Sequence, residues 1–264
     1  TINMKLITLA LAATAWLLSP FVDADDHEFV GGIDVNAAFN LQVQMCSLLD
    51  GVTQKDYDAL IKDYFKWSKK HDVEVTFIRQ VPLFGHATAR NPNPYDFVEF
   101  LASDHVTSGR GWDKWLTTSD GQKLGDRWAK LAQCDVKMAH AEMIWTDVDA
   151  MNSDRDRVVT WNWCTRKEGV SWDQLSAKHQ SVAATRNESA PNIGWAAFYP
   201  HLGGASAPGE MAHIVIYPDV ESLMQGAALD AQGGWRMLDD YYTSYADCGG
   251  QSAMLETIMY QPGD

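Results

Sequence analysis

Carboxylate and imidazole side chains occur at corresponding places in two stretches of this chain, and acid–base chemistry needs these groups. Glu142 and Glu256 lie in two β-rich segments, and His140 shares the strand face of Glu142 because alternate residues of a strand point the same way. Glu99 and His213 occupy a second pair of corresponding positions. We expect these five residues to line one shared cavity between the sheets that the two stretches form, where confinement and little water shift pKa values toward neutrality and let such groups act as acid and base. We therefore predict that Glu142, Glu256 and His140 are catalytic.

A second set of polar and aromatic residues is placed to bind a ligand beside these groups. The predicted ligand-binding residues are Glu99, His213, Gln44, Asn162 and Trp195. The carboxylates and imidazoles could also hold a divalent metal ion, but no metal ligand is assigned. The alternative for each of these residues is a place on a solvated sheet face or in a satisfied hydrogen bond, without a role in function.

Several familiar signatures are absent from the sequence. It contains no GxSxG, HExxH, P-loop or GxGxxG motif. Its four cysteines form no CxxC or CxxCH spacing, so haem attachment and structural zinc have no support. The net charge of −14 argues against nucleic acid or an anionic membrane as the main partner. The partner that we expect is a small organic ligand, and the sequence leaves the oligomeric state open.

These residues lie in an internal repeat. An offset of 118 residues brings Cys46 onto Cys164 and Pro82 onto Pro200 without a gap. Further along, an offset of 114 residues brings Cys134 onto Cys248 and Glu142 onto Glu256. The matches fall on cysteine, proline and glycine, whose types constrain the backbone. The sequence therefore predicts one fold unit used twice, over residues 36–148 and 155–264.

Each repeat is predicted to run strand, helix, strand, strand, helix, strand. Residues 39–46 alternate apolar and polar as a half-buried strand does, and a helix follows from a Thr53 cap. The order βαββαβ is the ferredoxin-like motif, which makes the fold class α+β. We expect helices to cover the apolar sheet side. The polar side, with Gln42, Gln44, Thr160 and Asn162, would then face water, a cavity or a partner sheet.

The cysteines fall at the first and last strands of each unit, which are antiparallel neighbours in this motif. Four cysteines allow three connectivities. The topology predicts the pairs Cys46–Cys134 and Cys164–Cys248, one disulfide bond in each unit.

The N-terminal residues 1–24 are predicted to be a secretory signal. Met4 would start translation, with residues 1–3 upstream of it, and Lys5 precedes an apolar run over residues 6–18. An uncleaved anchor is the alternative. After cleavage near Ala24 the protein would be secreted or periplasmic, where disulfides persist, with no stable membrane insertion.

A tandem of βαββαβ units resembles the dimeric α/β-barrel superfamily, in which two sheets pair into a barrel with helices outside. This superfamily includes antibiotic-biosynthesis-type monooxygenases and chlorite-dismutase-like haem proteins. The resemblance covers nearly the whole mature chain but only in element order, so it selects no subfamily and transfers no catalytic residue. Two ferredoxin-like domains packed side by side are the structural alternative.

Together with the predicted signal, the resemblance implies an exported barrel that binds a small organic molecule. As an enzyme it would be a cofactor-independent oxygenase or isomerase. The alternatives are a non-catalytic secreted protein that binds a ligand or partner, and a haem-binding barrel. No cofactor is assigned from the sequence.

Overall fold

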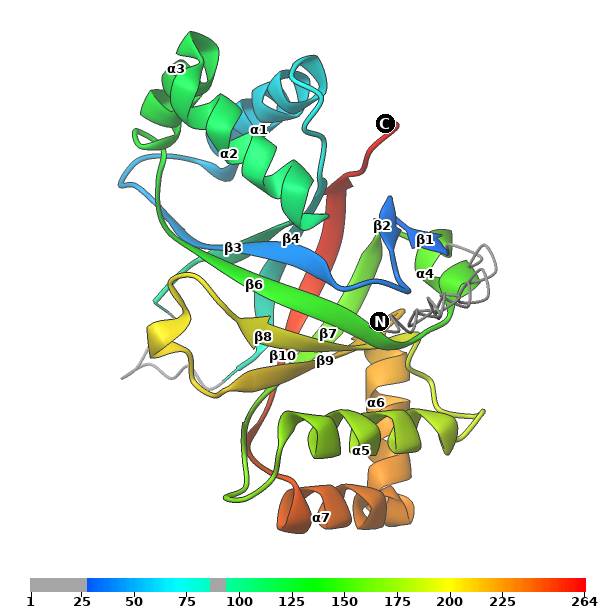
Figure 1. Ribbon diagram of the computed structural model, residues 1–264. Coiled ribbons are helices and arrows are strands. Elements are labelled where there is room, and N and C mark those ends of the chain that lie inside the picture. The colour runs from blue at the N-terminus through cyan, green and yellow to red at the C-terminus, as the bar shows by residue number, and fades with distance from the viewer. Residues whose placement is uncertain (1–27, 86–93) are drawn as a thin grey trace, which may run out of the picture.

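The structure is a computed structural model that describes residues 28–85 and 94–264, so the predicted signal at 1–24 lies outside the described residues. Its centre is a closed antiparallel barrel of eight strands in the order β10-β4-β5-β3-β6-β8-β9-β7. The helices lie outside it in two groups on opposite sides (Figure 1). This is the predicted α+β fold with its two sheets paired into a barrel.

Each half of the chain follows the predicted order of elements. The first half contains β3 (Phe39–Leu48), α1 (Gln54–Lys70), β4 (Thr76–Phe84), β5 (Phe97–Ser103), α2 (His105–Thr117), α3 (Ser119–Trp128) and β6 (Ala132–Thr146). The second half contains β7 (Asp156–Arg166), α5 (Trp172–Ala184), β8 (Gly194–Pro200), β9 (Met211–Tyr217), α6 (Val220–Leu229), α7 (Trp235–Ser244) and β10 (Ala246–Tyr260). Three short elements were not predicted: the hairpin of β1 (Phe29–Val30) and β2 (Ile33–Asp34), and the helix α4 (Val148–Ser153).

Side-chain caps set the helix boundaries. Thr53 accepts a hydrogen bond from the backbone of Asp56 and forms a capping box at the start of α1, as predicted. Thr118 ends α2 in an extended conformation and caps α3 through Gly121. The boundary between α2 and α3 therefore has a local cause, because Thr118 favours a new N-terminus over continuation of α2. Between α6 and α7 a π-turn spans Asp230–Gly234.

Both predicted disulfides are present. Cys46 lies opposite Cys134 where β3 pairs with β6, and their Cα atoms are 4.1 Å apart. Cys164 lies opposite Cys248 where β7 pairs with β10, and their Cα atoms are 4.0 Å apart. The first and last strands of each half are therefore the antiparallel neighbours that the motif requires.

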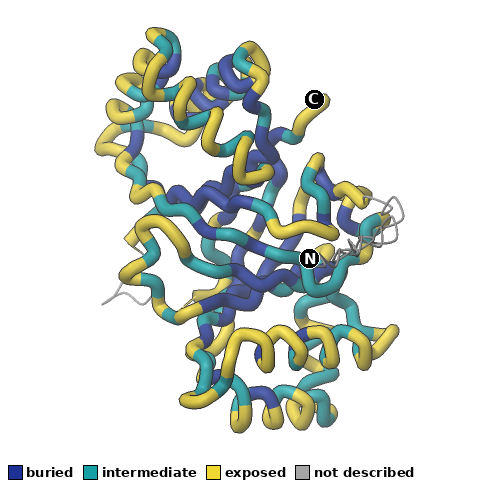
Figure 2. Tube along the Cα trace, in the orientation of Figure 1, coloured by how far each residue is buried: buried dark blue, intermediate teal, exposed yellow. Residues whose placement is uncertain are grey.

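The expected orientation of the sheet faces is wrong. The apolar residues of β3 and β7, including Leu41, Val43, Val159 and Trp161, point into the barrel and form its core. The burial is deepest along the strands (Figure 2). An eight-stranded barrel is just wide enough for side chains to fill it, so its interior takes the apolar set. The polar set lies on the outer face, beneath the helices.

A β-bulge in β10 places the two predicted catalytic glutamates on opposite faces of the sheet, although the sequence repeat aligns them. Cys248 pairs with Cys164, but Gln251 pairs with Asn162, so β10 holds one extra residue at this point. Gly250 has a φ of 94° there, which glycine adopts without steric strain. One extra residue moves every later side chain to the other sheet face. Glu256 therefore points into the barrel, whereas Glu142 lies on the outer face.

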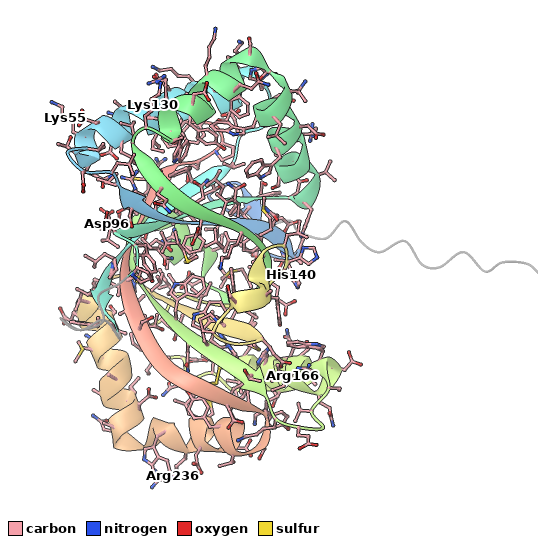
Figure 3. All side chains as sticks on the ribbon, turned by 90° about the vertical axis from the view of Figure 1, so that its left-hand side faces the viewer. Lys55, Asp96, Lys130, His140, Arg166 and Arg236 are labelled. Atoms are coloured by element: carbon pink, nitrogen blue, oxygen red, sulfur yellow. A yellow bond between two sulfur atoms is a disulfide. The ribbon has the colours of Figure 1, made fainter. Side chains whose placement is uncertain are left out.

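Helices α1, α2 and α3 cover the outer face of the first half, and α5, α6 and α7 cover that of the second. In Figure 3, Lys130 lies with the first helix group, Arg236 with the second, and His140 between them. Within residues 28–85 and 94–264, no helix combines the length and apolar character that crossing a membrane requires.

Candidate functional site

A cavity of about 520 Å³ lies between the helices and the outer sheet face of the second half. We call it the second-half pocket. Strands β7, β8 and β9 contribute Asn162, Trp195 and His213 to its wall, and α7 contributes Tyr241. Three residues predicted to bind ligand therefore meet in one cavity.

Its main polar feature is a chain of hydrogen bonds centred on Tyr241. The Trp195 Nε1–H donates to His213 Nδ1 at 3.1 Å. His213 Nε2 lies 2.9 Å from the Tyr241 hydroxyl, and His179 Nε2 from α5 lies 3.1 Å from the same hydroxyl. One tyrosine oxygen is therefore held between two imidazoles.

The indole fixes the direction of this chain, because an indole nitrogen only donates. His213 Nδ1 must accept, so the proton of neutral His213 is on Nε2 and is donated to Tyr241. The Tyr241 O–H is then free to donate to His179 Nε2, which places the His179 proton on Nδ1. This last nitrogen is buried and has no hydrogen-bond partner among the described residues.

Burial keeps both histidines neutral. Desolvation lowers the pKa of His213 to about 3, and the neighbouring His179 adds to the effect. Desolvation lowers the pKa of His179 to about 4. Burial also raises the pKa of Tyr241, so its hydroxyl keeps its proton. At neutral pH the chain is therefore uncharged, as its hydrogen-bond geometry requires.

A carboxylate completes the pocket. Asp230, at the start of the π-turn between α6 and α7, is the one carboxylate among the described residues that line this cavity. Desolvation raises its pKa, which moves it toward the range in which a carboxylate serves as a general base. No repeat match or motif in the sequence marks Asp230, Tyr241 or His179 as residues of a site.

Asn162 is held by two contacts at the edge of this pocket. Its Nδ2 donates to the Tyr242 hydroxyl at 3.2 Å, and its Oδ1 accepts from the Gly250 N–H of the bulge at 3.1 Å. The bulge therefore positions a pocket residue as well as setting the register of β10.

Glu99 and Gln44 lie in the first half. Glu99 corresponds to His213, since each pairs with the matching position of β3 or β7. Glu99 is 0% exposed and accepts from the Tyr57 hydroxyl at 2.7 Å and from Arg79 at 2.8 Å. Desolvation raises its pKa to about 7, against the opposing effect of Arg79. It is enclosed beneath α1, which supplies Tyr57, and does not line the second-half pocket.

The three predicted catalytic residues are not brought together. Glu256 lies inside the barrel, where Gln80 donates to it at 2.7 Å and Arg157 lies 3.8 Å away. Glu142 lies on the outer face and accepts from the Tyr199 hydroxyl at 2.9 Å. His140 stacks on Tyr199 with ring centroids 4.9 Å apart. The predicted shared cavity is therefore wrong, and the catalytic role of each residue stays a prediction.

Haem fits this pocket poorly. Among the described residues that line it, the one imidazole is that of His213, and both of its ring nitrogens are engaged in hydrogen bonds. His179 is 1% exposed and does not line the cavity. An axial ligand needs a free imidazole nitrogen. In the part of the chain that the structure describes, no group of three His, Cys, Asp or Glu side chains is arranged to hold a metal ion.

Comparison with solved structures identifies the fold. A candidate monooxygenase from Lactobacillus acidophilus is similar, with a TM-score of 0.55 and 9% identity over 86% of this chain and 98% of that one. A candidate chlorite dismutase has a TM-score of 0.52 and 8% identity, and the match covers 84% of this chain and 96% of that one. An anthrone oxidase-like protein has a TM-score of 0.50 and 7% identity, and the match covers 89% of this chain and 97% of that one. No protein-family profile and no curated protein matches the sequence. The chain has the dimeric α/β-barrel fold, with both halves of the barrel in one polypeptide.

Proposed function

We propose that this protein is an oxygenase-type enzyme that acts on a small, largely apolar ketone bound in the second-half pocket. One observation carries the proposal. Asp230 and Tyr241 line the same cavity. Asp230 is a carboxylate with a raised pKa, and the Tyr241 hydroxyl is oriented by two neutral imidazoles.

These two groups have complementary roles for a methylene whose carbanion is conjugated with a carbonyl, either directly or through an aromatic ring. Asp230 takes a proton from the methylene carbon, and the electron pair moves onto the carbonyl oxygen as an enolate. The Tyr241 O–H turns from His179 and donates to this oxygen, while His213 still donates to Tyr241. A hydrogen bond received from His213 polarises the Tyr241 O–H and strengthens its donation. Preorganised donors of this kind stabilise charge that develops in a transition state.

Molecular oxygen completes the reaction without a resident cofactor. The enolate carbon gives its electrons to O₂ and forms a C–O bond, and the proton held by Asp230 completes a hydroperoxide on that carbon. Asp230 then takes the second methylene proton, the O–O bond breaks, the carbon becomes a carbonyl, and the departing hydroxide takes up that proton as water. The overall change is R₂CH₂ + O₂ → R₂C=O + H₂O, in which the substrate supplies all four electrons. The anthrone oxidase-like neighbour supports a substrate class, because anthrone contains such a methylene.

The test is oxygen uptake by the purified protein with anthrone. The expected result is one O₂ consumed for each anthraquinone formed, faster than spontaneous oxidation. Asp230→Asn should lower the turnover rate at least 100-fold, and Tyr241→Phe about 10-fold to 100-fold. Asp239→Asn is the matched control, because Asp239 is an exposed residue of α7. Equal rates for wild type and Asp230→Asn would contradict the proposal.

An isomerase is the second candidate, because a carboxylate base and a tyrosine donor also suffice for proton transfer between two carbons. Oxygen uptake separates the two reactions, since an isomerase consumes none. A non-catalytic binding protein would bind anthrone without converting it. We also propose that the protein is exported, which the two disulfides support.

A further inference from the structure

A second cavity of about 530 Å³ lies in the first half, between the outer sheet face and helices α1, α2 and α3. We call it the first-half pocket. Its walls are aromatic: Tyr64, Trp67, Trp112, Trp115 and Trp128 line it. Trp67 and Trp115 meet edge to face with ring centroids 5.4 Å apart, and Tyr64 and Trp67 stack at 5.9 Å. These contacts hold the rings in fixed orientations.

The pocket contains an unsatisfied carboxamide. Gln44 lines the cavity and is 6% exposed, yet its side chain makes no hydrogen bond with any described residue. Its equivalent in the second half, Asn162, uses both its nitrogen and its oxygen. The Gln44 amide atoms are not among the fully buried polar atoms that lack a partner, so they are accessible from the cavity that the residue lines. Gln44 therefore has a donor and an acceptor available for a bound molecule.

A neighbouring residue adds a directed donor. Gln42, two positions along β3, accepts from Trp112 Nε1 at 2.7 Å through its Oε1. This bond fixes which way the amide faces, so the Gln42 Nε2 is left to donate. The first-half pocket therefore offers hydrogen bonds of both kinds from alternate positions on one face of β3.

The lining also restricts the charge of a ligand. Among the described residues that form the first-half pocket, none is Asp, Glu, Lys, Arg or His. A charged ligand would lose its hydration here without gaining an opposite charge. The described lining also holds no carboxylate or imidazole that could take the place of Asp230, so the pocket is suited to binding and not to a second copy of the proposed reaction.

We propose that the first-half pocket binds a neutral, planar aromatic or heteroaromatic molecule that carries an amide or lactam edge. The rings of the aromatic residues contact its faces. The carboxamide of Gln44 pairs with the N–H and C=O of the lactam, as an amide pairs with any edge that presents a donor beside an acceptor. This site is separate from the second-half pocket and does not depend on its chemistry.

The probe is 2-quinolinone, a neutral fused lactam, with naphthalene as a probe of similar shape that makes no hydrogen bonds. Binding is measured by calorimetry on the purified protein. We expect 2-quinolinone to bind about 10-fold more tightly than naphthalene. Gln44→Leu should remove this preference and leave naphthalene affinity within about 2-fold, because only the amide is lost.

Two variants, each of which fills one pocket, show where the probe binds, and neither removes a side-chain hydrogen bond. Gly111→Leu places a side chain in the first-half pocket, where an added Cβ meets nothing nearer than Val73 at 3.8 Å. Leucine also suits the middle of α2 better than glycine does, so folding is retained. Ala183→Leu is the matched change in the second-half pocket, which Ala183 of α5 lines.

Gly111→Leu should weaken 2-quinolinone binding at least 10-fold, and Ala183→Leu less than 2-fold. The reverse pattern would place the probe in the second-half pocket and overturn the inference. No binding of 2-quinolinone at 1 mM, or equal affinity of Gln44→Leu and wild type, would also overturn it. Anthrone turnover is read separately, so a failure of the proposed reaction leaves this result interpretable.

Discussion

Trp195 and His213 form the hydrogen bond that sets the protonation of the second-half pocket. The Trp195 indole donates to His213 Nδ1 at 3.1 Å from the neighbouring strand. Since the indole has no acceptor, this one contact determines the tautomer of His213, the direction of the Tyr241 hydroxyl and the tautomer of His179 in turn.

The first prediction concerns these tautomers. In ¹⁵N NMR spectra, we expect a protonated Nε2 on His213 and a protonated Nδ1 on His179. Trp195→Phe removes the donor, so His213 should show exchange between both tautomers, and turnover of anthrone should fall about 10-fold. Trp235→Phe is the control because Trp235 is half exposed on α7. An unchanged His213 spectrum in Trp195→Phe would refute the assigned direction.

The second prediction concerns the pH dependence of stability. The folded-state pKa values of His179 and His213 lie at about 4 and about 3, below the unfolded value of about 6.5. The unfolded chain therefore binds more protons below pH 6.5, and these groups destabilise the fold as pH falls from 6.5 toward 4. The raised pKa of Glu99, about 7, acts in the opposite direction over pH 7 to 4.5.

Because these effects oppose each other, the informative quantity is the difference between wild type and His179→Gln. When the pH is lowered from 7 to 5, the free energy of unfolding should fall by about 1 to 2 kcal/mol more in wild type than in the variant. Urea denaturation at the two pH values measures it. An equal loss in both proteins would mean that His179 is not held neutral by burial.

The third prediction concerns the bulge in β10. Gly250 has a φ of 94°, and an added Cβ would meet no atom within 4 Å. Gly250→Ala should therefore lower the free energy of unfolding by about 1 kcal/mol or more through backbone strain alone. Gly249→Ala is the matched control: its φ is not in the left-handed region, and its added Cβ meets one backbone oxygen at 4.0 Å. Urea denaturation should show a change below about 0.5 kcal/mol for this control.

The fourth prediction concerns the disulfides. Cys164 and Cys248 are separated by 84 residues, and Cys46 and Cys134 by 88. In the chain-entropy model, each bond stabilises the fold by about 4 kcal/mol. Replacing either pair by alanine should cause similar losses in urea denaturation. A loss below about 1 kcal/mol for both pairs would show that the unfolded chain is already compact in these loops.

Most of the fold could be predicted because its signals are local or repeated. The alternation in residues 39–46, the Thr53 cap and the cysteine spacings indicate strands, a helix start and cross-strand neighbours without any knowledge of distant residues. The same rules gave two correct disulfides. They failed at Gly249 and Gly250, where a pair of glycines inside a strand was a signal for a bulge that the ungapped alignment ignored.

The candidate site was only partly predictable. Asn162, Trp195 and His213 lie on adjacent strands of the second half, so strand parity placed them on one face. Tyr241, His179 and Asp230 come from helices and a π-turn, whose docking on the sheet follows from packing across the whole half. No local sequence pattern predicts which turn of α5 or of α7 packs against His213.

The sequence by itself determined the repeated βαββαβ unit, its strand and helix types and its disulfide pairs, since periodicity, caps and cysteine spacing act over short range. Only the tertiary structure decided which sheet face is the inside. Closing eight strands leaves room for side chains alone, so Leu41 and Trp161 fill the barrel, and Gln44 and Asn162 lie beneath the helices. Because the polar face lies outside the barrel, these candidate site residues line the two pockets beneath the helices and not a cavity between the sheets.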